Sequence, residues 1–264
     1  MLVLGFGLVV APLGCESDIA ATTSGGGTDS GITLTVSAAS DLALAFDEIV
    51  PAFAETTGVE ASVNLGSSGQ LAQQIEAGAP VDVFFSADSG YVHELIDKGL
   101  VDEGETSLYG LGRLAIWTRT DSGHDVQTLA ELADPAIRRI AIANPDHAPY
   151  GRAAKEALQG AGLWDGLQER LVLAENVLQA LQFADSGNAD VALVARSLSV
   201  EGEGRWVLVP ADSHKPIEQM SAVVSGSPEK EWARRFVEFV NGPEGRMIMR
   251  AHGFLLPGEA DPGD

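Results

Sequence analysis

The chain has 264 residues, of which 45% are hydrophobic and 20% charged; this suits one large domain or two modest ones and excludes a disordered tail. With 38 Asp and Glu against 16 Lys and Arg, the formal net charge of −22 argues against nucleic acid as a partner, because its phosphates would be repelled. An anionic ligand would have to be held by local donors against this field.

The N-terminal residues 1–14 are apolar and lead directly to Cys15, the single cysteine. They are too few to cross a bilayer as a helix and predict an export signal. A cysteine directly after Gly14 is typical of a bacterial lipoprotein, in which Cys15 would carry the lipid; an ordinary cleaved signal that contains a cysteine is the alternative. In either case we expect a periplasmic or cell-surface protein without an internal disulfide.

Residues 16–31 are small and polar and have no periodicity, which predicts a flexible linker between the lipid anchor and a folded body. From residue 32 onward, strand and helix patterns alternate. Strand patterns cover 32–39, 59–65 and 81–85, and each is followed by a helical pattern, the first with a kink expected at Pro51 and the third ended by Gly99. This alternation predicts a parallel sheet with helices on both faces.

A second series of the same kind follows, with strands expected at 113–118, 139–143, 171–174 and 191–195 and helices at 129–132, 151–160 and 177–184. Strands at 206–210 and 218–225 then precede a C-terminal helix whose apolar face returns to the first unit. We therefore predict an α/β fold of two doubly wound lobes, 32–111 plus 217–264 and 112–216. The cleft between them is the default ligand site.

Two serines in residues 66–70, Gly-Ser-Ser-Gly-Gln, raise the question of a nucleophile. The second glycine stands one position too early for a nucleophile elbow. The five histidines are isolated in the sequence, so none pairs with Ser68 and none indicates a metal site. We expect no enzyme and no cofactor, and a secreted serine hydrolase is the less favoured alternative.

Ser40 and Ser68 each follow a strand and directly precede a helix, which predicts N-cap positions. Three residues on stand Ala43 and Leu71, so no Glu or Gln competes for the free N–H groups there. Because strand ends in such a sheet face the crevice, both helix starts would offer hydroxyl and N–H donors to one anion. Asp41, the only carboxylate beside these residues, is favoured as a first-turn acid that suits the helix dipole.

The segments that carry these features, taken together, resemble the molybdate-binding proteins of ABC transporters, a type II periplasmic binding protein family, over residues 32–257. The resemblance implies two α/β lobes that capture molybdate or tungstate and deliver it to a membrane permease with its ATPase. We also expect a monomer. The segments are VSAASDLALAFDEI, LGSSGQLAQQIEAGAPVDVFFSAD, IANPDHAPYGRAAKEAL, GLWDGLQERLVLAENVLQAL and GFLLP.

The family's ligand positions carry over motif by motif. Its two serine ligands fall on Ser40 and Ser68, with Ser67 as a neighbour. Its two backbone N–H donors fall on Tyr150 and Val177. The resemblance therefore implies a molybdate ion contacted by Ser40, Ser68, Tyr150 and Val177.

A tyrosine whose hydroxyl reaches the anion in some members falls on Ala195, which has no hydroxyl. Arg196 or a water is left as the replacement. A fully deprotonated tetrahedral dianion only accepts hydrogen bonds, so an all-donor site suits it, whereas phosphate would need an acceptor for its proton. A binding protein for sulfate or phosphate remains the alternative.

Overall fold

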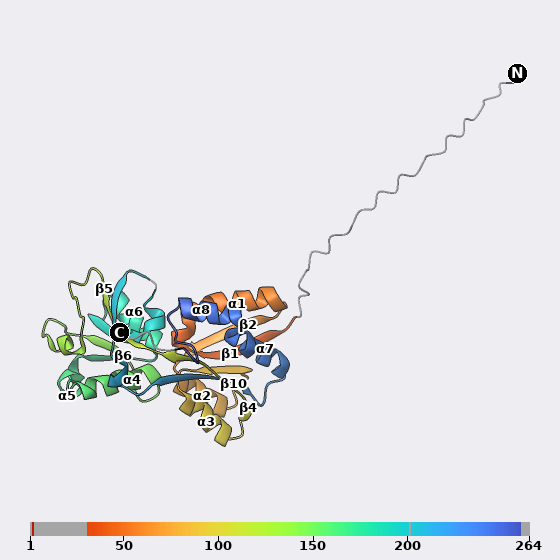
Figure 1. Cartoon of the computed structure of the whole chain (residues 1–264), viewed down its shortest axis with the longest axis horizontal. Coiled ribbons are helices and arrows are strands. Elements are labelled where there is room, and N and C mark those ends of the chain that lie inside the picture. The colour runs from red at the N-terminus through yellow and green to blue at the C-terminus, as the bar shows by residue number, and fades with distance from the viewer. Residues whose placement is uncertain (1, 3–30, 201, 260–264) are drawn as a thin grey trace.

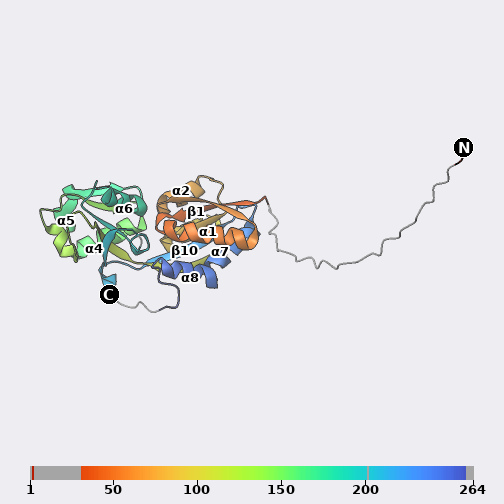
Figure 2. The same cartoon turned by 90° about the horizontal axis from the view of Figure 1, so that it is seen from above.

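A computed structural model of the chain describes residues 2, 31–200 and 202–259. The predicted signal with Cys15, and the linker as far as residue 30, lie outside the described residues. The described part forms two α/β lobes that lie side by side (Figure 1). The view from above shows the same two bodies (Figure 2). Across the described ranges, no helix is both long and apolar enough to cross a membrane.

The first lobe is built on a mixed sheet with the strand order β2-β1-β3-β10-β4. Strand β1 pairs in parallel with β2 and β3, whereas β10 runs antiparallel to both β3 and β4. The strands are β1 (Thr33–Ala39), β2 (Glu60–Gly66), β3 (Val83–Ser86), β4 (Val101–Gly112) and β10 (Ile217–Val224).

The second lobe holds the other mixed sheet, with the order β7-β6-β8-β5-β9. Strand β6 pairs in parallel with β7 and β8, and β5 is antiparallel to β8 and β9. The strands are β5 (Leu114–Arg119), β6 (Ile140–Ala143), β7 (Leu171–Ala174), β8 (Val191–Ala195) and β9 (Gly204–Leu208). The chain thus crosses between the sheets after β4 and again between β9 and β10.

Helices cover both faces of each sheet. In the first lobe α1, α7 and α8 lie on one face and α2 and α3 on the other (Figure 1). The helices are α1 (Ala43–Thr57), α2 (Ser68–Glu76), α3 (Ser89–Asp97), α4 (Pro149–Gly160), α5 (Trp164–Leu167), α6 (Val177–Asp185), α7 (Lys230–Asn241) and α8 (Pro243–Ala251). Short 3-10 helices are η1 (Ser40–Leu42), η2 (Leu129–Ala133), η3 (Gln168–Arg170), η4 (Arg196–Leu198) and η5 (Ala211–Ser213).

The core of the first lobe joins the C-terminal helix α7 to the N-terminal half of the chain. Phe236 of α7 lies edge-on against Phe46, Phe53 and Phe85, with ring centroids 5.9, 5.0 and 5.8 Å away. Such edge-to-face pairs add to the burial of apolar area. The tail therefore packs on the first lobe, and only two crossings connect the lobes.

Three details of the predicted elements differ from the structure. The sheets are mixed rather than parallel, because β10 enters from the second lobe and must run against the strands that end at the cleft. Strand β4 was not predicted, since its first half is polar and largely exposed. The expected helix at 129–132 is the 3-10 helix η2, which begins with a capping box between Thr128 and Glu131. Helix α1 includes Pro51, as the sequence pattern predicted.

Candidate functional site

A narrow cavity lies where the two lobes meet. Its walls come from segments that follow the carboxyl ends of strands, which is where open α/β sheets bind ligands. Ser40, Ser67, Ser68, Tyr150 and Val177 all line it, whereas Arg196 does not. The remaining lining residues are Ala39, Asp41, Gly66, Ala87, Ala148 and Pro149.

Ser40 and Ser68 are buried and accept hydrogen bonds from backbone N–H groups of other segments. Ser68 Oγ accepts from the N–H of Ala87 at 2.9 Å, and Ser40 Oγ accepts from the N–H of Leu178, in the other lobe, at 3.4 Å. Among the described residues neither hydroxyl donates a hydrogen bond to the protein. Each therefore keeps its proton for a group in the cavity.

The prediction that these two serines are N-caps is wrong. Ala39 precedes η1 and Ser67 precedes α2, and neither makes a side-chain capping bond. Each helix starts on the serine itself, one residue earlier than the pattern predicted. The serine side chains are consequently free of their own helices and available to the cavity.

Tyr150 and Val177 stand in the first turns of α4 and α6. The first N–H groups of a helix have no partner within it and carry the positive end of the helix dipole. The side chain of Asn176, directly before α6, accepts a hydrogen bond from the backbone N–H of Gln179. This cap does not use the backbone N–H of Val177. Both starts can offer backbone donors to an anion without a cationic side chain.

Asp41 is a wall of the same cavity and is only 1% exposed. Its Oδ2 accepts hydrogen bonds from the Tyr150 hydroxyl at 3.0 Å and from Gln219 Nε2 at 2.6 Å. Burial raises the pKa of Asp41 from its ordinary value of 3.8 to about 6, although these two hydrogen bonds lower it. The sequence placed Asp41 in a first turn but gave no signal that Gln219 would meet it.

Ser67 lies at the border of the lobes, with its Oγ 2.7 Å from His147 Nδ1 and 3.0 Å from Gln70 Oε1. This serine and histidine pair was not foreseen from the sequence. A hydrolase also needs a group that orients the histidine. Within the described part of the chain, no carboxylate is hydrogen-bonded to His147, so this pair lacks that element of a catalytic triad.

Gly69 allows the two lobes to touch. Its N–H donates to the carbonyl of His147 at 3.0 Å, and a Cβ there would lie 2.5 Å from the Tyr91 hydroxyl oxygen and 2.7 Å from that carbonyl oxygen. The sequence suggested glycines for close approach of the backbone to an anion. At Gly69 the close approach is to the other lobe instead.

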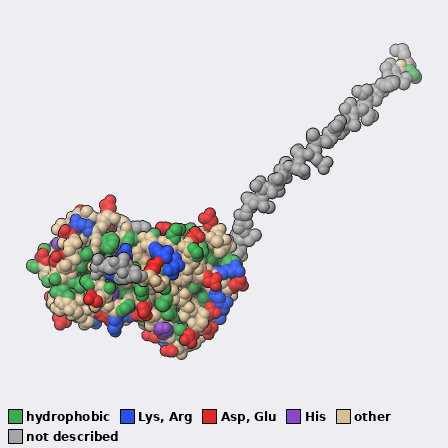
Figure 3. All heavy atoms as spheres, viewed as in Figure 1, with side chains coloured by type: hydrophobic (Ala, Val, Ile, Leu, Met, Phe, Trp, Pro, Cys, Tyr) green, Lys and Arg blue, Asp and Glu red, His purple; other side chains and the backbone are tan. Residues whose placement is uncertain are grey.

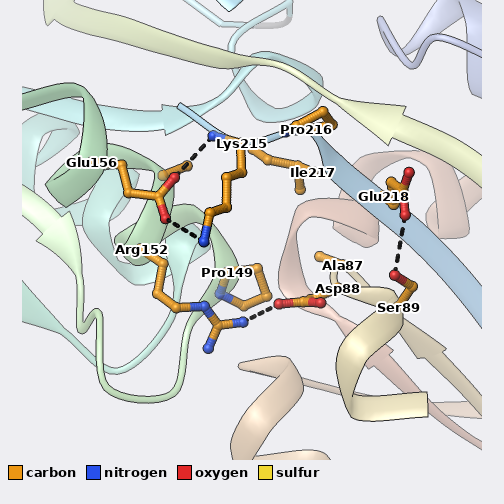
Figure 4. A pocket seen from close by; sticks show the side chains of 11 residues that line it. Ala87, Asp88, Ser89, Pro149, Arg152, Glu156, Lys215, Pro216, Ile217 and Glu218 are labelled. Carbon is orange, nitrogen blue, oxygen red and sulfur yellow. Dashed lines mark hydrogen bonds and ion pairs between the residues drawn. The ribbon is translucent and has the colours of Figure 1, made fainter. Parts of the chain in front are cut away.

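A second, larger pocket adjoins the cavity and shares Ala87 and Pro149 with it (Figure 4). Arg152 of α4 crosses this pocket to form an ion pair with Asp88, and it also donates to the Tyr91 hydroxyl at 2.6 Å. Lys215 Nζ lies 3.9 Å from a Glu156 carboxylate oxygen. Both cations at this entrance are thus paired with acids.

Arg196 does not line the cavity, and its guanidinium carbon lies 5.8 Å from the ring centroid of Trp206. Ala195, at the end of β8, is fully buried. Across the described ranges, no cluster of three or more His, Cys, Asp or Glu is placed to hold a metal ion. The cavity is therefore lined by neutral donors and one buried carboxyl group.

Comparison with known proteins gives a consistent picture. The family model of bacterial extracellular solute-binding proteins matches residues 34–255. The molybdate-binding protein ModA of Rhodobacter capsulatus is 35% identical over 210 residues, which cover 79% of this chain and 82% of that protein. A putative ABC transporter substrate-binding lipoprotein, YvgL of Bacillus subtilis, is 29% identical over 250 residues, or 91% and 92% of the two chains.

Among solved structures, the periplasmic molybdate-binding protein of Azotobacter vinelandii superimposes with a TM-score of 0.80. It is 34% identical, and the match covers 85% of this chain and 99% of that one. The similarity therefore spans both lobes and the cavity between them.

Proposed function

Because the chain belongs to the family of bacterial extracellular solute-binding proteins, we propose that it captures molybdate, and tungstate in the same way, between its lobes. One observation carries the proposal: two hydroxyls and two helix starts converge on a cavity that, in the described structure, no Lys or Arg lines. A fully deprotonated dianion accepts hydrogen bonds and donates none, so such a set of donors suits it.

The proposed ligands are the hydroxyls of Ser40 and Ser68 and the backbone N–H groups of Tyr150 and Val177, with Ser67 as a further neighbour. The relatives named for molybdate support the choice of anion. Tungstate is proposed because it has the same shape and charge. No covalent step is involved, so the site binds and does not catalyse.

We further propose that the lobes close on the anion by a hinge motion and that the closed form is presented to an ABC permease with its ATPase. The two crossings between the lobes are compatible with such a hinge. A protein outside the cytoplasm, held by a lipid on Cys15, fits both the family and the relative named as a lipoprotein. We propose that it acts as a monomer.

A second candidate ligand is hydrogen phosphate, and Asp41 is the observation that favours it. A bound phosphate that keeps a proton needs an acceptor in the wall of its site, and the Asp41 carboxyl is such a group. Tyr150 and Gln219 already donate to its Oδ2. Only its Oδ1, which has no partner in the described structure, is left for a ligand proton.

A thermal unfolding scan with molybdate, tungstate, sulfate and phosphate separates these candidates. A ligand at about 100 times its Kd stabilises the folded state by about 2.7 kcal/mol. We expect this shift with molybdate and tungstate and none with sulfate or phosphate. A shift with sulfate or phosphate alone would contradict the proposal.

A matched pair of variants ties the shift to the cavity. Ser68→Ala removes a proposed ligand hydroxyl, so the molybdate shift should shrink strongly, whereas Ser186→Ala, on the exposed surface, should leave it unchanged. The same proteins test for hydrolysis of a simple ester. Turnover that Ser68→Ala abolishes would revive the hydrolase interpretation.

A further inference from the structure

Three side chains form a buried polar cluster between the lobes, which we call the buried clasp: Asp41, Gln219 and Tyr150. Asp41 and Gln219, on η1 and β10, belong to the first lobe, and Tyr150, on α4, belongs to the second. Their exposed fractions are 1%, 0% and 2%. The cluster therefore exists only while the lobes are together.

In the first lobe, Asp41 and Gln219 together form a hydrogen-bonding position for the Tyr150 hydroxyl. Gln219 Nε2 donates to Asp41 Oδ2 at 2.6 Å and so holds the carboxyl group in place. The Tyr150 hydroxyl lies 3.0 Å from the same Oδ2 and 3.1 Å from Gln219 Nε2. Because Asp41 accepts from both groups, removing its oxygen leaves the buried Tyr150 hydroxyl without an acceptor and takes one of the two acceptors from Gln219 Nε2.

Gly112, the last residue of β4, makes room for this hydroxyl. A Cβ at that position would lie 2.3 Å from the Tyr150 hydroxyl oxygen and 2.9 Å from Gln219 Nε2. The second lobe also fixes the backbone beside the clasp, since Ser197 Oγ donates to the carbonyl of Asp41 at 2.8 Å. Asp41 is thus held from the second lobe through both its side chain and its main chain.

Tyr150 connects this clasp to the ligand cavity. Its backbone N–H, in the first turn of α4, is a proposed donor to the oxyanion, and its hydroxyl ends in the clasp. Asp41 in turn directly follows Ser40, a proposed ligand on the first lobe. The clasp therefore joins the backbones that carry one proposed donor from each lobe.

We propose that Asp41 and Gln219 are positioning residues that receive the Tyr150 hydroxyl when the lobes close and hold its backbone N–H against the bound oxyanion. This inference rests on the proposed function. Because the clasp forms only on closure, it should slow release of the anion and leave the rate of capture almost unchanged.

Asp41 serves in this arrangement as a hydrogen-bond acceptor and not as a charge. A carboxylate beside a bound dianion is unfavourable, because like charges repel strongly in a buried site. Asn keeps an acceptor oxygen without the charge.

The test measures the rate constant for molybdate release from the whole protein, by stopped-flow chase with excess tungstate. Tyr150→Phe keeps the ring and the backbone N–H and removes the hydroxyl. We expect its release to be faster by up to about tenfold, as for the loss of one buried hydrogen bond. Its association rate constant and its ligand-free melting temperature should stay close to those of the wild type.

Variants of Asp41 separate positioning from general damage to the fold. Asp41→Ala should release molybdate as fast as Tyr150→Phe, whereas Asp41→Asn should release it at the wild-type rate or more slowly. Asp47→Asn, an exposed acid on α1, is the matched control and should behave as wild type. If Tyr150→Phe does not fold, Gln219→Leu is measured in its place, and faster release is again expected.

Wild-type release from a folded Tyr150→Phe would overturn the inference, and so would an Asp41→Asn variant as defective as Asp41→Ala. Binding of the four anions by the wild type shows separately whether the proposed function is wrong. If the wild type binds sulfate or phosphate but not molybdate, the proposed ligand is wrong, and the clasp is judged by release of the anion that binds. If it binds none of the four anions, both proposals are wrong.

Discussion

At the scale of single residues, the site combines neutral donors with one buried acid. Ser68 Oγ accepts a hydrogen bond from the N–H of Ala87, and Ser40 Oγ accepts one from the N–H of Leu178. The O–H group of each serine is therefore available to donate to a ligand. Asp41 is different, since burial favours its neutral form. A bound dianion would favour the neutral form further, because like charges repel in a buried site.

The pKa of Asp41 predicts a pH dependence of stability. Burial raises this pKa from 3.8 to about 6, so the folded chain binds more protons than the unfolded chain between these values. The contribution of Asp41 to the free energy of unfolding therefore falls as pH rises through this window, by about 3 kcal/mol in all, and stays low above about pH 6.

The variant Asp41→Asn has no such loss. The free energy of unfolding of the variant minus that of the wild type should therefore be largest at about pH 8, and at about pH 5 it should be roughly half as large. Chemical denaturation of both proteins at the two pH values measures this difference, with Asp47→Asn as the control for an exposed acid. A difference of the same size at both values would contradict the assignment.

The four proposed ligand residues were singled out from local sequence information. The segments around Ser40, Ser68, Tyr150 and Val177 each combine a strand end with a helix start, and the structure brings all four to one cavity. The partners of Asp41 could not be predicted, because Gln219 lies on a strand that returns from the other lobe. Likewise, nothing in the sequence pairs Ser67 with His147.

At the scale of elements, the cleft edge depends on how strands and helices meet. Three parallel strands, β1, β2 and β3, end there, and the alternation of strand and helix predicted this part of the sheet. The reversed direction of β10 was not predicted, because a strand's pattern of apolar residues carries no information on its direction. Strand β4 was not predicted because its first half is polar and largely exposed and therefore lacks an apolar pattern.

The contact between the start of α2 and the loop before α4 gives a test at this scale. Gly69→Ala would place a Cβ 2.5 Å from the Tyr91 hydroxyl oxygen and 2.7 Å from the carbonyl oxygen of His147. Since these atoms belong to different segments at the lobe border, we expect both lobes to fold but full closure to be prevented.

Small-angle scattering with and without molybdate measures this closure. The wild type should become more compact when molybdate is added, and Gly69→Ala should change less and bind more weakly. Gly104→Ala is the control, because a Cβ at Gly104 meets no atom within 4 Å. Equal compaction of Gly69→Ala and wild type would show that this contact does not limit closure.

At the scale of the whole molecule, a strongly acidic protein is proposed to bind an anion. Acidic side chains are spread over both lobes on the face shown in Figure 3. The two cations at the entrance pocket, Arg152 and Lys215, are already paired with Asp88 and Glu156. Local donors must therefore overcome a repulsive field, as the net charge of −22 indicates.

This field predicts that salt speeds capture. Raising the ionic strength from about 0.01 to 0.2 M shortens the Debye length and screens the repulsion. The association rate constant for molybdate, measured by stopped flow, should therefore increase, while an uncharged osmolyte at matched osmolality should leave it unchanged. A decrease with salt would mean that Arg152, Lys215 or another basic group dominates the approach of the anion.

We propose that Ser40, Ser68, Tyr150 and Val177 hold a molybdate ion between the lobes. A crystal structure of the chain grown with molybdate, with anomalous data at the molybdenum edge, locates the ion directly. We expect one anomalous peak in the cavity, within hydrogen-bond reach of the two hydroxyls and two N–H groups. Absence of the peak, or a peak away from these four donors, would contradict it.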